Sequence, residues 1–254
     1  MMKTKILIIL SLFTCGISSL LAAERADSLS GSKPKVKPEL SVDLVSANTW
    51  RGSYIAGFSV QPALGFSVEG FSLEAWGSTD LNFSKGGYTE VDLTASYSRW
   101  GATISIVDYC WTNADGIFDY FGKYENNHYL ELGVGFDFGE WFSKVPISLG
   151  ANVMLYGANV TDKGEQAYSA YFSIDYNQPI RNILTIDVSV SAALERGNAA
   201  LYSGNNGFSV VCTSLGASKT FNIKDKININ LAVDFIVNPA TERFCFAAKA
   251  GFSL

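Results

Sequence analysis

Beyond its N-terminal segment the sequence has no apolar run of the roughly 18 residues that a membrane-spanning helix needs. Charged residues are scarce, at 17% of the chain, and a formal net charge of −5 argues against a nucleic-acid partner. A single histidine, His128, and no metal-ligand spacing leave no basis for expecting a metal or cofactor. Apolar residues nevertheless make up 48% of the sequence. This combination suits either a soluble all-β protein or a membrane β-barrel.

The N-terminal segment has the layout of an export signal. Lys3 and Lys5 precede an apolar run, which is followed by small residues, so we expect a signal peptide over residues 1–23. Residues 12–15 weakly resemble a lipoprotein box. Residues 24–39 contain two prolines and few apolar residues, which predicts a disordered periplasmic linker before a barrel over residues 40–254. Three cysteines would then remain, an odd number that does not fit a disulfide framework.

The last strand shows the pattern on which the fold prediction depends. Even positions from Phe244 to Leu254 are apolar, and odd positions are mostly small or polar. Since a strand presents alternate residues to opposite faces, one face would meet lipid and the other a lumen. The same period of two recurs along the chain, with irregularities that predict a β-bulge near Asp108 and a change of parity near Cys212. We therefore predict an all-β, transmembrane, antiparallel up-and-down β-barrel of about 12 strands. Its expected strands are residues 40–51, 59–69, 71–81, 89–98, 101–111, 128–138, 146–157, 167–177, 183–195, 207–219, 226–237 and 244–254.

The connections alternate between short turns and longer loops, as periplasmic and extracellular ends do in outer-membrane barrels. An even number of strands would put both ends of the barrel domain in the periplasm. Aromatic residues near strand ends predict two interfacial girdles. The expected girdle residues are Trp50, Tyr88, Tyr109 and Trp111 at the loop end, and Tyr97, Trp100, Trp141, Phe142 and Phe221 at the turn end.

A secreted lipocalin-like barrel or sandwich is the alternative fold. Its outer face would then consist of Ser, Gly, Ala and Thr, with little of the Lys and Glu that keep soluble surfaces dispersed. The sequence therefore favours the membrane barrel.

Residues 42–52, which end in Trp50-Arg51-Gly52, resemble the opening strand of the TorF-type porin family. Residues 61–64 and 72–78 are similar to the second and third strands of that family. The resemblance covers about residues 42–80 and implies a mid-sized barrel of the Gram-negative outer membrane. The chain departs from the family pattern in its short first loop and its proline-rich N-terminal tail.

By parity, many charged side chains should face the lumen. Charge at membrane depth is costly unless it meets water or a partner, so this predicts a hydrated, cation-preferring interior. Glu74, Glu90 and Asp92 are expected to form its main negative cluster, with Arg51 as the neighbouring cation; Lys219 is also expected inside. Alternatively, the carboxylates are bonded across a plugged lumen that Trp76, Met154, Tyr156 and Tyr171 help to fill. The expected pore-lining residues are Asp43, Arg51, Glu74, Glu90, Asp92, Glu131, Asp137, Asp175, Asp187, Glu195, Asp234 and Lys249.

The predicted function is a porin-like channel for small solutes with a weak cation preference. The alternative is a non-conducting scaffold that binds partners through the aromatic loop at residues 113–127. An outer-membrane hydrolase is a weaker hypothesis, because His128 has no His-x-Ser-Asn context and would have to meet Asp115, Asp119 or Asp162 in space. The expected partners are outer-membrane lipid and the barrel insertion machinery, which would recognise Phe252 and Leu254 as an assembly signal.

Overall fold

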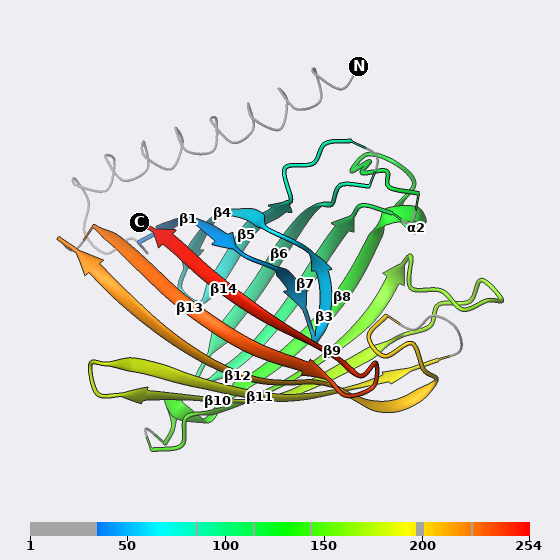
Figure 1. Ribbon diagram of the computed structural model, residues 1–254. Helices are drawn as coiled ribbons and strands as arrows, with labels where there is room; N and C mark the ends of the chain where they lie inside the picture. The colour runs from blue at the N-terminus through cyan, green and yellow to red at the C-terminus, as the bar shows by residue number, and fades with distance from the viewer. Residues whose placement is uncertain (1–34, 85, 114, 143, 197–200, 225) are drawn as a thin grey trace.

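The computed structural model describes residues 35–254, except 85, 114, 143, 197–200 and 225; the predicted signal peptide lies outside this part. Twelve strands form a closed antiparallel barrel in which each strand pairs with its neighbours in sequence, and β1 closes against β14 (Figure 1). This confirms the predicted fold class. None of the helices in the described residues is long and apolar enough to cross a membrane. The barrel strands are β1 (Lys37–Val45), β4 (Ser59–Val68), β5 (Phe71–Thr79), β6 (Thr89–Arg99), β7 (Ala102–Trp111), β8 (His128–Asp137), β9 (Ile147–Gly157), β10 (Ala170–Ile180), β11 (Leu184–Glu195), β12 (Gly207–Ile223), β13 (Ile227–Asn238) and β14 (Arg243–Ser253).

Four short elements lie outside the barrel wall. The strands β2 (Asn48–Trp50) and β3 (Ser53–Ala56) form a separate two-stranded sheet between β1 and β4. A helical turn, α2 (Tyr124–Asn127), precedes β8, and a 3-10 turn, η2 (Phe138–Glu140), follows it. We call the end of the barrel that carries residues 46–58 and α2 the loop end. The opposite end, where β14 finishes and η2 lies, is the turn end.

The first strand differs from its prediction at both ends. It begins at Lys37, inside the segment expected to be a disordered linker, and it stops at Val45 rather than near residue 51. At its start, Lys37 to Glu39 pair only with β4, because the pairing with β14 begins at Ser41. Pro38 therefore sits on a one-sided edge, where its missing N–H disturbs the ladder least.

The closure between β1 and β14 is short. Val42 pairs with Phe252 and Asp43 with Gly251, and the N–H of Leu254 donates to the carbonyl of Leu40 at 3.1 Å. Only five register pairs join the two strands, whereas β1 and β4 share nine. Residues after Lys249 therefore supply more than half of the seam.

Deleting residues 251–254 should prevent assembly, because it removes three of those register pairs and exposes an open edge. We expect the shortened protein to stay in the periplasm, degraded or aggregated. Heat-modifiability of the protein in outer-membrane fractions measures this. A normal folded band from the deletion variant would refute the expectation.

The outer surface is an apolar wall. The even positions of β14 that were predicted to face outward do so: Phe244 is 76% exposed and Phe246 61%. Phe235, the cross-strand partner of Phe246, and Val233, the partner of Ala248, are also exposed. A monomer rarely leaves so continuous an apolar surface uncovered. The inward face of β14 instead carries small and polar side chains.

Two bulges shape the wall. The parity change predicted near Cys212 is confirmed: Ser191 pairs with Cys212 and Ala192 with Val210, so Val211 is the extra residue. The bulge predicted near Asp108 is wrong, because β7 keeps a continuous register with both neighbours. A register shift lies instead between β8 and β9, next to Leu130. It places Tyr156, expected in the lumen, outside the barrel at 49% exposure.

Other side chains also face differently from the prediction. Lys219, expected in the lumen, lies on the outer face because the parity of β12 places it there. It pairs with the exposed Leu231, and the Lys219 ammonium lies 5.9 Å from the ring of Phe221. Trp100, Trp141 and Phe142 are exposed at the turn end, as the girdle prediction requires. At the loop end the predicted girdle fails, because Trp50, Tyr109 and Trp111 pack together in the interior.

Candidate functional site

The segment between β1 and β4 folds into the barrel. Arg51 and Gly52 have φ values of +50° and +85°, and Trp50 pairs with Ser53, so the turn is of the two-residue hairpin type that needs positive φ at both central positions. A Cβ on Gly52 would overlap the carbonyl of Val211 on β12. Glycine is thus required both by conformation and by close approach. The lumen hairpin, residues 48–56, therefore docks on the β12 bulge.

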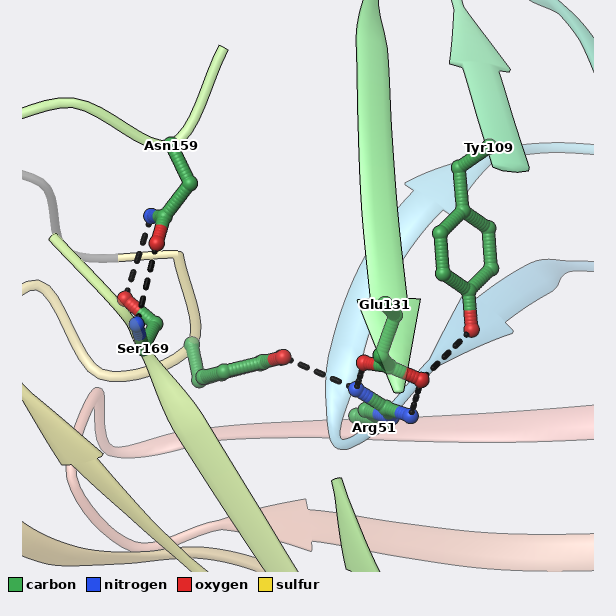
Figure 2. Close-up of polar contacts among 6 residues, drawn as sticks. Arg51, Tyr109, Glu131, Asn159 and Ser169 are labelled. Atoms are coloured by element: carbon green, nitrogen blue, oxygen red, sulfur yellow. Dashed lines mark hydrogen bonds and ion pairs between the residues drawn. The ribbon is translucent and has the colours of Figure 1, made fainter. Parts of the chain in front are cut away.

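An ion pair holds the tip of the lumen hairpin (Figure 2). The guanidinium of Arg51 donates to both oxygens of Glu131 on β8, at 2.5 and 2.8 Å. Tyr109 donates to the same carboxylate at 3.0 Å, and Arg51 also donates to the hydroxyl of Tyr202 at 2.8 Å. The two charged side chains are only 13% and 2% exposed. Such a two-point contact fixes the relative orientation of the two side chains. Because both charges are out of water, each is stabilised mainly by the other, and removing one leaves the other uncompensated.

Tyr202 is held in place by a carboxylate of the barrel wall. Glu195 accepts hydrogen bonds from the backbone N–H groups of Leu201, Tyr202 and Ser203, the last two at 2.8 Å, and from the Ser203 hydroxyl at 2.5 Å. Glu195 is 1% exposed, so it organises a loop rather than presenting charge to solvent. On the neighbouring loop, the side chain of Asn159 bonds both the hydroxyl and the N–H of Ser169, at 3.1 and 3.0 Å (Figure 2).

Aromatic rings fill the lumen around this ion pair. Tyr171 lies under the guanidinium of Arg51, 4.4 Å from ring centroid to Cζ, and Trp50 lies 4.7 Å away. Met154 and Val211 are fully buried against the rings. We call this set the aromatic layer, and it joins the wall strands β7 to β12 to the lumen hairpin. Its rings are those of Trp50, Tyr109, Trp111, Tyr129, Tyr171 and Tyr202.

The remaining side of the lumen, along β4 to β6, is packed with polar groups. Asn48 of the hairpin bonds Ser78 at 3.2 Å, and Gln61 bonds Asn48 at 3.2 Å. Glu90 and Asp92 are 6% and 8% exposed at the same level. Together with the aromatic layer, these buried residues pack the loop half of the lumen in the part of the chain that the structure describes.

The predicted negative cluster is therefore divided. Glu90 accepts from Tyr88 at 2.9 Å inside the packed region, whereas Glu74, further toward the turn end, is exposed. The expectation that Arg51 neighbours these carboxylates is wrong, because the lumen hairpin carries Arg51 across to Glu131. One oxygen of Asp92 and the indole N–H of Trp111 are buried without hydrogen-bond partners among the described residues.

Solvent reaches the lumen-facing carboxylates toward the turn end. Asp43 and Lys249 form an ion pair of 3.4 Å with side chains 30% and 39% exposed. Asp187 on β11 and Asp234 on β13 both flank Gly216 of β12. Asp137 accepts from the N–H of Gly139 at 2.8 Å, so it caps η2 at the rim. We call this half the acidic vestibule. Its charged residues are Asp43, Glu74, Asp175, Asp187, Asp234 and Lys249, together with Glu39, which the sequence analysis had assigned to the linker.

His128 is not a solvated rim residue. It is 4% exposed, with Nδ1 3.0 Å from Asp108 and Nε2 3.0 Å from the carbonyl of Tyr120. Tyr124 donates to the same Asp108 carboxylate at 2.7 Å. The carboxylate that contacts the ring is thus that of Asp108, which was not among the three expected candidates. Because both ring nitrogens face an acceptor, neither is free to act as a general base. The cluster fastens the 113–127 loop to the outer wall.

No family model matches the chain, and no curated protein matches it either. Among solved structures it is similar to the NanC porin, with a TM-score of 0.45 and 9% identity over 86% of this chain and 99% of the other. It is also similar to an outer membrane channel from Pseudomonas putida F1, with a TM-score of 0.42 and 10% identity over 87% and 96% of the two chains. The translocator domain of the autotransporter NalP from Neisseria meningitidis gives a TM-score of 0.38 at 8% identity over 94% and 96%. At these values the likeness is limited to general architecture.

Proposed function

We propose that this protein is an outer-membrane β-barrel that passes small solutes, with a weak cation preference, and that its resting state is closed by the lumen hairpin. The continuous apolar outer wall supports a place in lipid, because charged side chains on that face are nearly absent and aromatic residues gather at its turn end.

The observation that carries the proposal is how the lumen hairpin is held inside the barrel. The β2–β3 sheet is separate from the barrel sheet, so no strand ladder ties the lumen hairpin to the wall. Docking depends on the Arg51–Glu131 ion pair and on side-chain packing, with hydrogen bonds from Arg51 to Tyr202 and between Asn48 and the wall residues Ser78 and Gln61. The hairpin can therefore leave the lumen without breaking the barrel's own ladder. Two discrete arrangements of one element are what a gate requires.

The cation preference follows from the charge of the acidic vestibule. Six carboxylates and one ammonium line it in the described part of the chain, and a ring of fixed negative charge in a water-filled tube attracts cations. Lys249 pairs with Asp43, and one ammonium cannot offset all six carboxylates. Charge within the packed loop half contributes less until the hairpin moves.

Reversal potentials across planar bilayers in a KCl gradient should show cation selectivity that weakens at high salt, because the screening length falls from about 10 Å at 0.1 M to about 3 Å at 1 M. Neutralising the vestibule with Asp175→Asn, Asp187→Asn and Asp234→Asn should remove most of that selectivity. The matched control, Asp162→Asn, Glu165→Gln and Glu242→Gln, changes net charge equally on exposed loops and should not. Anion preference of the wild-type channel would contradict the charge argument.

The packed layer also supports a second candidate, a non-conducting barrel that displays its loops as a binding surface. The two functions separate in the same apparatus. If neither the wild type nor variants that undock the hairpin conduct, although all insert as folded barrels, the scaffold function replaces the channel.

A further inference from the structure

A cavity of about 470 Å³ opens at the loop end, between the end of β7, α2 and the start of β8. We call it the loop cleft. Trp111 and Tyr129 form part of its wall, with ring centroids 4.4 Å apart and planes at 31°. Trp111 also contacts Trp50 of the lumen hairpin, at 5.0 Å between ring centroids. The cleft therefore lies directly against the aromatic layer. Its lining residues are Trp111, Thr112, Asn113, Asp115, Glu125, Asn126, Asn127, Tyr129 and Ala158.

The charge of the loop cleft has one sign. Asp115 and Glu125 are the charged residues among those lining it in the described chain, and both are exposed. Tyr156 donates to Glu125 at 2.6 Å, and this hydrogen bond lowers the pKa of the Glu125 carboxyl, which keeps it ionised. Among the described residues no lysine or arginine lines the cavity, although Lys123 lies close enough to Glu125 to lower its pKa further.

Two further carboxylates lie close to the aromatic wall. Glu90 is the strand partner of Trp111, and Asp92 is the partner of Tyr109. Asp92 is 8% exposed, and one of its oxygens has no hydrogen-bond partner among the described residues. Arg51, the guanidinium of the aromatic layer, is engaged by Glu131 rather than by these two carboxyl groups.

We infer that the loop cleft binds small organic cations, with ammonium or guanidinium groups against Trp111 and Tyr129 and between the Asp115 and Glu125 carboxylates. Electron-rich ring faces attract cations, indole most strongly, and the two carboxylates add a long-range attraction in the same place. Anionic solutes would meet like charge and no donor side chain of opposite sign. A dication with two amines offers one positive charge to each of the two carboxylates that line the cavity.

Binding here does not require the barrel to conduct, so the inference can succeed or fail independently of the proposed channel. The full-length protein, refolded in detergent and verified by heat-modifiability, is titrated with 1,4-diaminobutane at pH 7 and followed by saturation-transfer NMR. Sodium butyrate and glucose serve as the anionic and neutral comparison solutes. We expect the diamine alone to give saturable signals.

The double variant Asp115→Asn with Glu125→Gln should weaken diamine binding about tenfold or more, and Trp111→Leu should weaken it by roughly 2–5-fold, the range of an exposed cation–π contact. The control pair Asp162→Asn with Glu165→Gln removes the same charge from the next loop and should leave affinity unchanged. Because Asp115 and Glu125 are exposed, the double variant should fold. Equal binding of glucose or butyrate, unaltered affinity in the double variant, or no diamine binding by the folded wild type would each overturn the inference.

Discussion

Replacing Glu131 by alanine should undock the lumen hairpin and raise the open probability of the barrel by roughly a hundredfold or more. Removing one partner of a buried ion pair leaves the other charge uncompensated, which costs about 3–5 kcal/mol, and each 1.4 kcal/mol corresponds to a factor of about ten. Arg51 is 13% exposed against a ring of aromatic side chains, so it cannot regain water without moving. The hairpin can relieve this cost by leaving the lumen, because it shares no ladder with the wall. Single-channel recordings of wild type and variant measure the change.

Two controls make this result specific to the gate. The double variant Arg51→Ala with Glu131→Ala removes both charges, and we expect a smaller increase than Glu131→Ala alone gives, since no buried charge remains. Asp43→Asn breaks the half-exposed pair with Lys249, which should change gating little because exposed pairs contribute about 0–1 kcal/mol. A folded Glu131→Ala barrel that stays closed would show that the hairpin is a permanent plug.

The wall of the barrel could be predicted from sequence because its rule is local. Alternation with a period of two locates each strand and assigns each residue to a face without knowledge of any partner. For β11 the expected range, 183–195, and the observed Leu184–Glu195 agree within one residue. The bulge at Val211 was also detectable, because a bulge shifts the parity of the residues that follow it.

The lumen hairpin could not be predicted because its position depends on contacts distant in sequence. Arg51 meets Glu131 across 80 residues and Tyr202 across 151. Nothing in the segment around Trp50 distinguishes a loop that projects outward from one that folds inward. The bulge predicted at Asp108 was wrong for a related reason. A carboxylate on an apolar face indicates a bulge when nothing is known to bind it, but here the distant His128 and Tyr124 form hydrogen bonds with it.

Part of the aromatic layer could have been predicted from the sequence. Tyr109 and Trp111 lie at the end of β7, where girdle residues occur, and this position suggested the girdle. Their parity is opposite to that of Ile104 and Ile106, which are 51% and 41% exposed on the outer wall. Parity alone would have placed both rings in the lumen, whereas the sequence analysis followed their position and assigned them to the girdle. Position along a strand and side of the strand are separate signals, and the second determines which surface a residue faces.

The assignment of the apolar face to lipid gives the last prediction: Val188→Arg should destabilise the barrel by about 2–4 kcal/mol, the cost measured for arginine near the bilayer midplane of such barrels. Val188 lies near the middle of β11, is 37% exposed on the outer wall, and pairs with Tyr176 and Leu215, which are exposed as well. An arginine there would meet lipid with no partner.

Ser189→Arg, one residue further along β11, is the matched comparison. Ser189 points into the acidic vestibule opposite Asp175, so an arginine there gains water and a carboxylate at cross-strand distance. We expect this variant to cost less than about 1 kcal/mol or to be neutral, a range typical of solvated ion pairs. Urea-unfolding midpoints in lipid vesicles compare the two, with Val188→Leu as the control for a change of size alone. Equal losses for the two arginines would mean that both faces are equally hydrated or equally buried. In that case the apolar wall would not be a lipid surface, and the membrane placement on which the channel proposal depends would fail.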